Sequence, residues 1–337
     1  MRILFASSEV GLGHITRDLY LAKRMTWARI TWLTSGLALR YLEAKGVEIH
    51  PASYLREDLG RYVEALFVNG VLKPSYSGLV KLVDAGRRNA ETILSSVNLS
   101  EYDVVLADES WDFVASDGIG CKSVFITDFV RFKPQASLLQ YLALPFVNRE
   151  LAKALRKFDL KIYVGLDPRL KTDDFEFYGQ IFTHDYEVEV GGWDGAVINL
   201  GGTSAGNVLL EKAVPVLKRL GVDYKILGPE PHFVVDPLSY LASSKLVLTL
   251  GGYSTLLEVA RFKRRAVITP LGRDFEQRDN ARMFEGRSGY RVIPLDRVDE
   301  EVLLKYVKEV LDETPEPPVF TDGSEAIASK VRLLAED

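Results

Sequence analysis

Apolar segments that predict strands alternate with helical patterns along almost the whole chain. The apolar runs of these strands are continuous, which is typical of a parallel sheet that helices cover on both faces. In the first half we expect strands at residues 3–7, 30–34, 47–52, 104–107, 123–127 and 160–164. The segments between them place apolar side chains at helical spacing. This order predicts an α/β domain that is doubly wound and Rossmann-like.

A polar, turn-rich stretch at residues 166–195 interrupts the alternation, which then resumes. The later strands are expected within residues 196–200, 218–227, 245–250, 265–271 and 290–295. We therefore predict two doubly wound Rossmann-like domains facing a cleft. Their expected boundaries are residues 1–165 for the N-terminal domain, 166–195 for a linker, 196–320 for the second domain and 321–337 for a C-terminal segment. The last helix, at residues 324–335, is compatible with packing on either domain.

The composition excludes several classes of function. A net charge of −5 and a pI near 5.6 argue against a nucleic-acid partner, which usually meets a basic surface. A single cysteine, Cys121, excludes an internal disulfide and indicates a reducing compartment. No apolar run is long enough to span a bilayer, and the amino terminus lacks signal-peptide architecture, so we expect a cytoplasmic protein. The scattered histidines form no metal-ligand cluster, and we expect neither metal nor cofactor.

A glycine-rich turn follows the first strand and opens a helix. Gly11 and Gly13 allow close backbone approach of a phosphate or another ligand. His14 stands at the helix start, at the edge of the sheet where open α/β sheets bind ligands, and Arg17 is one turn further on. The alternative is a tight turn with a half-exposed histidine and a solvated arginine. A lone G-x-G motif does not decide between the two.

Two carboxylates follow strands of the first half and are expected at the same sheet edge. Asp108 and Asp128 both stand just after a predicted strand. A carboxylate in this place can act as a general base or orient a histidine. Each is also compatible with the simpler role of a helix cap.

Small and hydroxylated residues follow the first strand of the second half. They are Gly201, Gly202, Thr203 and Ser204. Such a turn suits a phosphate or a sugar that approaches the backbone. It is not a Walker loop, because no Gly-Lys-Ser/Thr ending occurs. The alternative is an ordinary strand-to-helix turn that Thr203 or Ser204 caps.

The segment 248–280 reads as strand, Gly251-Gly252 turn, helix, strand and polar loop. The first helical residues, Tyr253, Ser254 and Thr255, would present backbone N–H groups and a positive helix end to an anion. Glu258, one turn into the helix, suits the two hydroxyls of a ribose, although Thr255 and Glu258 also match a capping box. Gln277 and Asn280 are expected on the polar loop, at the same sheet edge. Phosphate-binding groups followed by hydroxyl-binding groups indicate a nucleotide-sugar.

Residues 129–157 are rich in basic and apolar side chains. Six basic residues stand there against one acidic residue, Glu150. Such a stretch can dock on an anionic membrane surface, here the inner face of the membrane. We favour the simpler interpretation, a core helix with a solvated basic face or a loop that meets an anionic acceptor.

The chain resembles the GT-B glycosyltransferases, in particular glycosyltransferase family 28, most strongly over residues 196–295. Its Gly-Leu-Gly-His-Ile-Thr-Arg opening at 11–17 is also similar to a set of uncharacterised glycosyltransferase-like proteins. The resemblance implies that the turn at 201–206 lies beside the donor and that the turn and helix at 251–258 bind its diphosphate. It further implies that Glu258 binds ribose and that Gln277 and Asn280 contact the sugar. The donor would be a nucleotide-sugar, usually UDP-linked, bound by the second domain without a metal. The acceptor, a small molecule, a glycan or a lipid-linked molecule, would lie against the first.

These observations lead to a primary hypothesis of inverting glycosyl transfer. His14, oriented by Asp108 or Asp128, would remove the proton of the acceptor hydroxyl. The leaving diphosphate would meet the helix start at 253–255, together with Arg17.

Two alternatives stay open at this point. An isomerase resembling the UDP-sugar 2-epimerases would use Asp108, Glu109 and Asp128 as acid–base groups. The other alternative is a non-catalytic nucleotide-sugar-binding subunit, against which the intact Gly-Leu-Gly-His at 11–14 argues.

Overall fold

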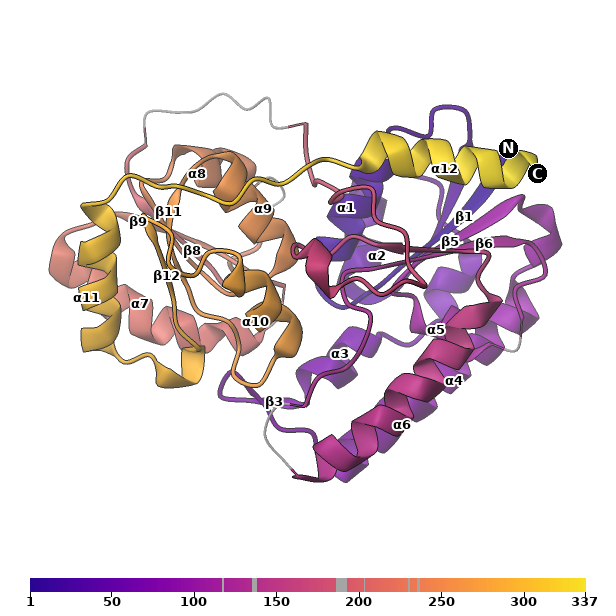
Figure 1. Cartoon of the computed structure of the whole chain (residues 1–337), viewed down its shortest axis with the longest axis horizontal. Helices are drawn as coiled ribbons and strands as arrows, with labels where there is room; N and C mark the ends of the chain where they lie inside the picture. The colour runs from indigo at the N-terminus through magenta and orange to yellow at the C-terminus, as the bar shows by residue number, and fades with distance from the viewer. Residues whose placement is uncertain (117, 135–137, 186–192, 203, 230, 235–236) are drawn as a thin grey trace. The chain divides into compact units, whose positions relative to one another are not determined.

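The computed structural model describes residues 1–116, 118–134, 138–185, 193–202, 204–229, 231–234 and 237–337. The chain divides by its contacts into two compact units, each built around its own five-stranded sheet (Figure 1). The first unit contains Met1–Leu66, Pro74–His184 and Thr321–Asp337. The second contains Phe67–Lys73 and Asp185–Phe320. Two parallel, helix-covered sheets confirm the predicted α/β fold of two Rossmann-like domains.

The sheet of the first unit is parallel throughout, in the order β2-β1-β5-β6-β7. Its strands are β1 (Arg2–Ser7), β2 (Arg29–Leu33), β5 (Val104–Asp108), β6 (Lys122–Thr127) and β7 (Leu160–Tyr163). Residues 3–6 and 104–107 are completely buried, which explains the unbroken apolar runs. From β1 the chain continues to β2 on one side and then crosses to β5 on the other side of β1. The order in which the strands are added therefore reverses between β1 and β5. Open α/β sheets bind ligands at the carboxyl ends of the strands at such a point.

The helices of the first unit are α1 (Gly13–Ala22), α2 (Gly36–Lys45), α3 (Leu59–Glu64), α4 (Tyr76–Ser96), α5 (Trp111–Ala115), α6 (Leu138–Ala154) and α12 (Ser324–Glu336). Helix α12 is the C-terminal helix, and it packs against α1 and β6, so the chain returns to its first unit (Figure 1). The Tyr20 hydroxyl on α1 donates to Asp322 over 2.8 Å and so holds the segment before α12 against α1.

The sheet of the second unit has the order β12-β11-β10-β8-β9 and is also parallel. Its strands are β8 (Ala196–Asn199), β9 (Tyr224–Leu227), β10 (Leu246–Thr249), β11 (Arg265–Ile268) and β12 (Tyr290–Val292). Its helices are α7 (Asn207–Leu220), α8 (Leu238–Ser243), α9 (Tyr253–Arg261), α10 (Phe275–Arg282) and α11 (Glu300–Leu311). Here the order in which the strands are added reverses between β8 and β10. These two strands lead into the two glycine turns.

A short hairpin from the first half of the chain belongs to the second unit. Its strands are β3 (Phe67–Val68) and β4 (Val71–Leu72). Leu72 N–H donates to the Gly272 carbonyl and Gly272 N–H to the Gly70 carbonyl, each over 2.8 Å. Residues 67–73 were expected within the first domain. The expected linker, residues 166–195, is divided between the units, with residues 166–184 in the first and 185–195 in the second.

One predicted strand is absent. The apolar run at residues 47–52 forms only a single bridge, between Ile49 and Trp32. Pro51 then starts a short 3₁₀ helix, Pro51–Leu55, in which the His50 side chain accepts the Ala52 N–H. Proline has no N–H to give to a ladder, so the strand prediction for 47–52 was wrong.

Candidate functional site

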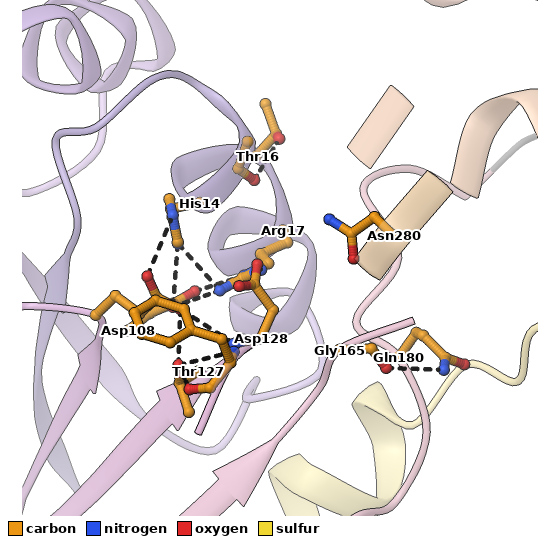
Figure 2. A network of polar contacts seen from close by, with 12 residues as sticks. His14, Thr16, Arg17, Asp108, Thr127, Asp128, Gly165, Gln180 and Asn280 are labelled. Atoms are coloured by element: carbon orange, nitrogen blue, oxygen red, sulfur yellow. Dashed lines mark hydrogen bonds and ion pairs between the residues drawn. The ribbon is translucent and has the colours of Figure 1, made fainter. Parts of the chain in front are cut away.

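The three residues predicted to be catalytic come together at the carboxyl edge of the first sheet (Figure 2). His14 is the second residue of α1, Asp108 is the last residue of β5, and Asp128 directly follows β6. His14 Nδ1 lies 3.2 Å from Asp108 Oδ1. Asp128 contacts this pair through Arg17, and Asp108 is therefore the carboxylate that orients the imidazole.

Arg17 is the centre of the cluster. Its Nε donates to Asp108 Oδ2 over 2.7 Å and its Nη2 to Asp108 Oδ1 over 2.6 Å, a bidentate pair. Its Nη1 donates to Asp128 Oδ2 over 2.8 Å, and Nη2 lies 3.0 Å from His14 Nδ1. The residue is only 1% exposed. We expected Arg17 to meet the leaving diphosphate, but this placement gives it a different role, the internal counter-charge that fixes His14, Asp108 and Asp128.

The charges around His14 set its protonation. Burial and Arg17 both lower the pKa of His14, but Asp108 and Glu109 outweigh them and leave it above its ordinary value of 6.5. Burial alone would raise the pKa of Asp108, but Arg17 and His14 hold it well below its usual range. An ionised Asp108 beside Nδ1 favours the tautomer with its proton on that atom. Nε2 of the neutral ring is then free to accept a proton.

Glu109 is a site residue that the primary hypothesis missed. Its carboxyl group is buried, with Oε1 2.8 Å from the Thr127 hydroxyl and accepting the Asp128 N–H over 3.1 Å. Its Oε2 lies 3.9 Å from His14 Nε2. Burial and Asp128 raise the pKa of Glu109 to about 8, against the opposing charges of His14 and Arg17. The sequence offered only an acidic pair, Asp108-Glu109, and no sign of which side chain would turn inwards.

A second buried ionic cluster lies in the same unit and was not predicted. Arg56 pairs with Asp112, and its Nη2 lies 3.5 Å from Glu9 Oε2. Glu9 Oε1 accepts the Leu59 N–H over 3.3 Å. Burial raises the pKa of Glu9 to about 7, although Arg56 lowers it. Glu9 lies between β1 and α1, and Asp112 lies on α5, so this cluster links the segments that follow β1 and β5.

In the second unit, Asn199 at the end of β8 organises the first glycine turn. Its Oδ1 accepts the Gly201 N–H over 2.9 Å, and its Nδ2 donates to Thr255 Oγ1 over 3.1 Å. Gly201 has a φ of 70°, a conformation that favours glycine. Gly202 is the next residue of this turn, and Ser204 begins a 3₁₀ helix, Ser204–Gly206, while Thr203 lies outside the described residues. Helix α7 has Gly206 as its N-cap, with no side-chain cap bond.

The polar segment expected as a loop is a helix, α10, with Asp274 as its N-cap. Asp274 Oδ1 accepts the Gln277 N–H over 3.1 Å, and this bond starts the helix although its residues are almost all polar. Gln277 Oε1 accepts the N–H groups of Gly251 and Leu271 over 3.2 and 3.1 Å. Asn280 Nδ2 donates to the Gly251 carbonyl over 3.2 Å. The side chains predicted to contact a sugar thus hold the glycine turn in place.

Gly251 cannot carry a side chain here, since a Cβ atom would lie 2.3 Å from the Gln277 carbonyl oxygen. Gly252, in contrast, has open space at its Cα and is the N-cap of α9. Tyr253, Ser254 and Thr255 therefore form the first turn of α9, as predicted. The capping box was wrong, because Thr255 is the third helical residue and bonds Asn199 instead. Glu258 is buried on this helix, 5% exposed.

Among the described residues, no group of three or more His, Cys, Asp or Glu side chains has an arrangement that could hold a metal ion. Within the same residues, no helix is both long and apolar enough to cross a membrane.

Comparison with known proteins identifies the second half most clearly. Residues 206–337 match the model of the glycosyltransferase family 28 C-terminal domain. The match runs through α12, the helix that returns to the first unit. The chain is also 27% identical, over 187 residues, to a UDP-N-acetylglucosamine–N-acetylmuramyl-(pentapeptide) pyrophosphoryl-undecaprenol N-acetylglucosamine transferase of Staphylococcus haemolyticus. That match spans 46% of this chain and 53% of the relative, so the chain matches about half the length of this curated protein.

Solved glycosyltransferases share the fold over the full length. The spinosyn rhamnosyltransferase SpnG has a TM-score of 0.62 at 16% identity, covering 100% of this chain and 96% of its own. MurG of Acinetobacter baumannii has a TM-score of 0.58 at 14% identity, covering 98% of this chain and 99% of its own. SpnG complexed with thymidine diphosphate has a TM-score of 0.60 at 16% identity, with coverages of 100% and 96%. The chain is thus a GT-B protein similar to glycosyltransferase family 28.

Proposed function

We propose that this chain is an inverting glycosyltransferase that moves a sugar from a nucleotide-sugar donor to a hydroxyl group of an acceptor. The observation that carries the proposal is the contact between His14 and the buried Asp108, at the edge of the first sheet where ligands bind. The family 28 domain in the second half supports a sugar donor rather than another nucleotide substrate.

The donor belongs to the second unit. The N-terminus of α9 follows two glycines and carries the positive end of the helix dipole, which suits a diphosphate. Glu258, on the same helix, would accept hydrogen bonds from ribose hydroxyls. We propose a UDP-linked donor, because the relative from S. haemolyticus is named for UDP-N-acetylglucosamine. The proposed reaction requires no metal or cofactor, since the helix dipole meets the charge of the leaving diphosphate.

The chemical step follows from His14. Its Nε2 takes the proton of the acceptor hydroxyl while that oxygen forms a bond to the anomeric carbon. The bond from this carbon to the phosphate oxygen breaks, and the nucleoside diphosphate leaves with the electron pair. Attack opposite the leaving group through an oxocarbenium-like transition state inverts the anomeric centre. Asp108 stabilises the imidazolium that forms.

The thermal-shift panel that tests donor binding uses UDP-, GDP-, CDP- and dTDP-sugars. A ligand at a hundred times its dissociation constant adds about 2.7 kcal/mol to the free energy of unfolding. The donor that shifts the melting temperature is then assayed for transfer. Loss of transfer with unchanged donor binding is expected for His14→Ala. Turnover by this variant at the parent rate would remove His14 as the base.

A specific observation favours an isomerase as the second candidate, since Asp108 and Glu109 lie beside one histidine and Asp128 is linked to it through Arg17. Incubating UDP-N-acetylglucosamine without an acceptor separates the two, because only an isomerase gives an epimer. Tight donor binding with neither hydrolysis nor transfer would instead indicate a binding subunit.

We also propose a cytoplasmic protein that touches the inner face of the membrane through α6, with an acceptor that is lipid-linked. Tyr141, Leu142 and Phe146 are exposed on this helix, and basic side chains such as Lys153 accompany them. An apolar face flanked by basic residues suits an anionic bilayer. Leu142→Ser/Phe146→Ser should lose sedimentation with phosphatidylglycerol vesicles. Val319→Ser, which removes an even more exposed apolar residue of the second unit, should not. Equal sedimentation of both variants would refute the contact.

A further inference from the structure

Glu109 has a backbone conformation that side chains rarely adopt. Its φ is 45°, in the left-handed region, directly after the last residue of β5. A non-glycine residue costs about 1–2 kcal/mol in this region, and such residues concentrate at functional sites. Glycine would remove that cost. The strained position therefore points to a role for the carboxyl group itself.

The two oxygens of Glu109 have different surroundings. Oε1 accepts the Asp128 N–H and lies 2.8 Å from the Thr127 hydroxyl, so β6 anchors it. Oε2 lies 3.9 Å from His14 Nε2 and has no hydrogen-bond donor within the part of the chain that the structure describes. In the neutral carboxyl group the proton therefore belongs on Oε2, on the side of the imidazole.

The separation of 3.9 Å is too long for a direct hydrogen bond but suits a bridging atom. An oxygen placed about 2.8 Å from both atoms would see them at an angle of about 90°, within the range of hydroxyl geometry. A hydroxyl group satisfies both partners in one way only. It donates its proton to His14 Nε2 and accepts the proton of Glu109 Oε2, which leaves one lone pair for the anomeric carbon.

We propose that Glu109 is a second acceptor-binding residue of the active site, and that its Oε2–H group holds the attacking hydroxyl against His14. This inference rests on the proposed function. It also names the acceptor group as a neutral hydroxyl, because an anionic nucleophile would be repelled by the ionised carboxylate of Asp108 beside His14.

The proposal predicts a pH dependence. The charged and titratable groups around Glu109 are His14 and Arg17 on α1, Asp108 on β5 and Asp128 after β6. With a pKa of about 8, Glu109 loses its proton on the alkaline side. The carboxylate then competes with His14 for the hydroxyl proton. The rate should rise as His14 is deprotonated and fall again as Glu109 ionises.

The experiment compares Glu109→Gln with Glu109→Ala, using UDP-N-acetylglucosamine as donor and glycerol as the probe alcohol. In the Gln variant the amide oxygen can replace Oε1 and the amide N–H can replace the Oε2–H donor. We expect this variant to keep a higher kcat/KM for the alcohol than Glu109→Ala near pH 7 and to lose the alkaline fall. The Ala variant should lower kcat/KM for the alcohol about 10- to 100-fold, the usual cost of losing a positioning contact. Glu57→Gln, far from His14 in the chain and paired with Arg88, is the matched control.

An alkaline fall that persists unchanged in Glu109→Gln overturns the proposal, as does parent-like kcat/KM in Glu109→Ala. If the parent turns over none of the UDP-, GDP-, CDP- and dTDP-sugars, the proposed function fails. The contact between Glu109 and His14 is then tested by a second measurement that needs no turnover. In protein labelled with ¹³C-histidine, the Cε1 resonance of His14 should show a second titration step near pH 8 that Glu109→Gln abolishes. A single step in the parent overturns the assignment.

Discussion

Replacing Glu109 by glutamine should change how the stability of the first unit depends on pH. The carboxyl group has a pKa of about 8 in the folded chain, against an ordinary value of 4.5. Between these values the unfolded chain releases a proton that the folded chain keeps, so raising the pH favours unfolding. Integrated from pH 5 to pH 7, Glu109 alone lowers the free energy of unfolding by about 2–3 kcal/mol. Glutamine is neutral throughout and removes this loss.

Urea denaturation at pH 5, 6 and 7 measures the effect, with tryptophan fluorescence as the probe. Of the four tryptophans, only Trp193 belongs to the second unit. A Trp193→Phe background therefore restricts the signal to the first unit. On going from pH 5 to pH 7, the stability of Glu109→Gln relative to the parent should rise by about 2–3 kcal/mol.

Two other groups act in the same pH window. Glu9, with a pKa raised to about 7, also destabilises the folded chain as the pH rises. His14 acts in the same direction, because its pKa is also raised in the folded chain. Its protonation stabilises the fold, and this stabilisation is lost as the pH rises through that pKa. The contribution of Glu9 remains in the variant. That of His14 becomes smaller, because Glu109 is one of the groups that raise the pKa of His14, so the comparison measures Glu109 together with its effect on His14. Glu57→Gln is the control, because its pKa, lowered to about 2 by Arg88, lies outside the window. Parallel pH curves for the parent and Glu109→Gln would refute the reasoning.

Three further changes test the site. Gly251→Ala should lower the melting temperature and abolish the donor-induced shift, because its Cβ would overlap the Gln277 carbonyl; overpacking of this kind costs about 1–3 kcal/mol. Arg17→Met should lower the free energy of unfolding by about 3–5 kcal/mol in urea titrations, because it leaves buried carboxyl groups without their counter-charge. Arg88→Met, which removes an exposed arginine, is the control. A smaller loss for Arg17→Met than for this control would contradict the proposed role of Arg17. Asn199→Ala should cost about 1–2 kcal/mol and weaken donor binding measured by calorimetry, because it frees the Gly201 turn from Thr255.

The sequence predicted the sheets and the residues at their edges, for a physical reason. Strands buried on both faces need continuous apolar runs, and these are visible without a structure. Parallel strands also deliver their last residues to one edge. Asp108, Asp128 and the glycine turns could therefore be placed before their contacts were known.

The parts that could not be predicted depend on contacts between distant segments. Arg17 stands one turn after His14, but its burial follows from the order β1-β5-β6, which brings two carboxyl groups to it. Helix α10 lacks an apolar period, and it forms because Asp274 caps it and Gln277 and Asn280 bond the Gly251 turn. Thr255 matched a capping box in sequence, but Asn199 from another strand bonds it instead.

Charge balance explains why neighbouring carboxyl groups can have different roles. Asp18, Asp108 and Glu109 are buried near one guanidinium and one imidazole. Charging all three would leave excess negative charge in a medium that solvates it poorly. Arg17 selects Asp108 by a bidentate bond, so Asp108 is the ionised group and can orient His14. Burial raises the pKa of Asp18 well above its ordinary value and that of Glu109 to about 8, so both hold their protons near neutral pH. A neutral Glu109 is able to donate a hydrogen bond, as the proposed acceptor site requires, and the same burial that makes it a donor makes the first unit less stable as the pH rises.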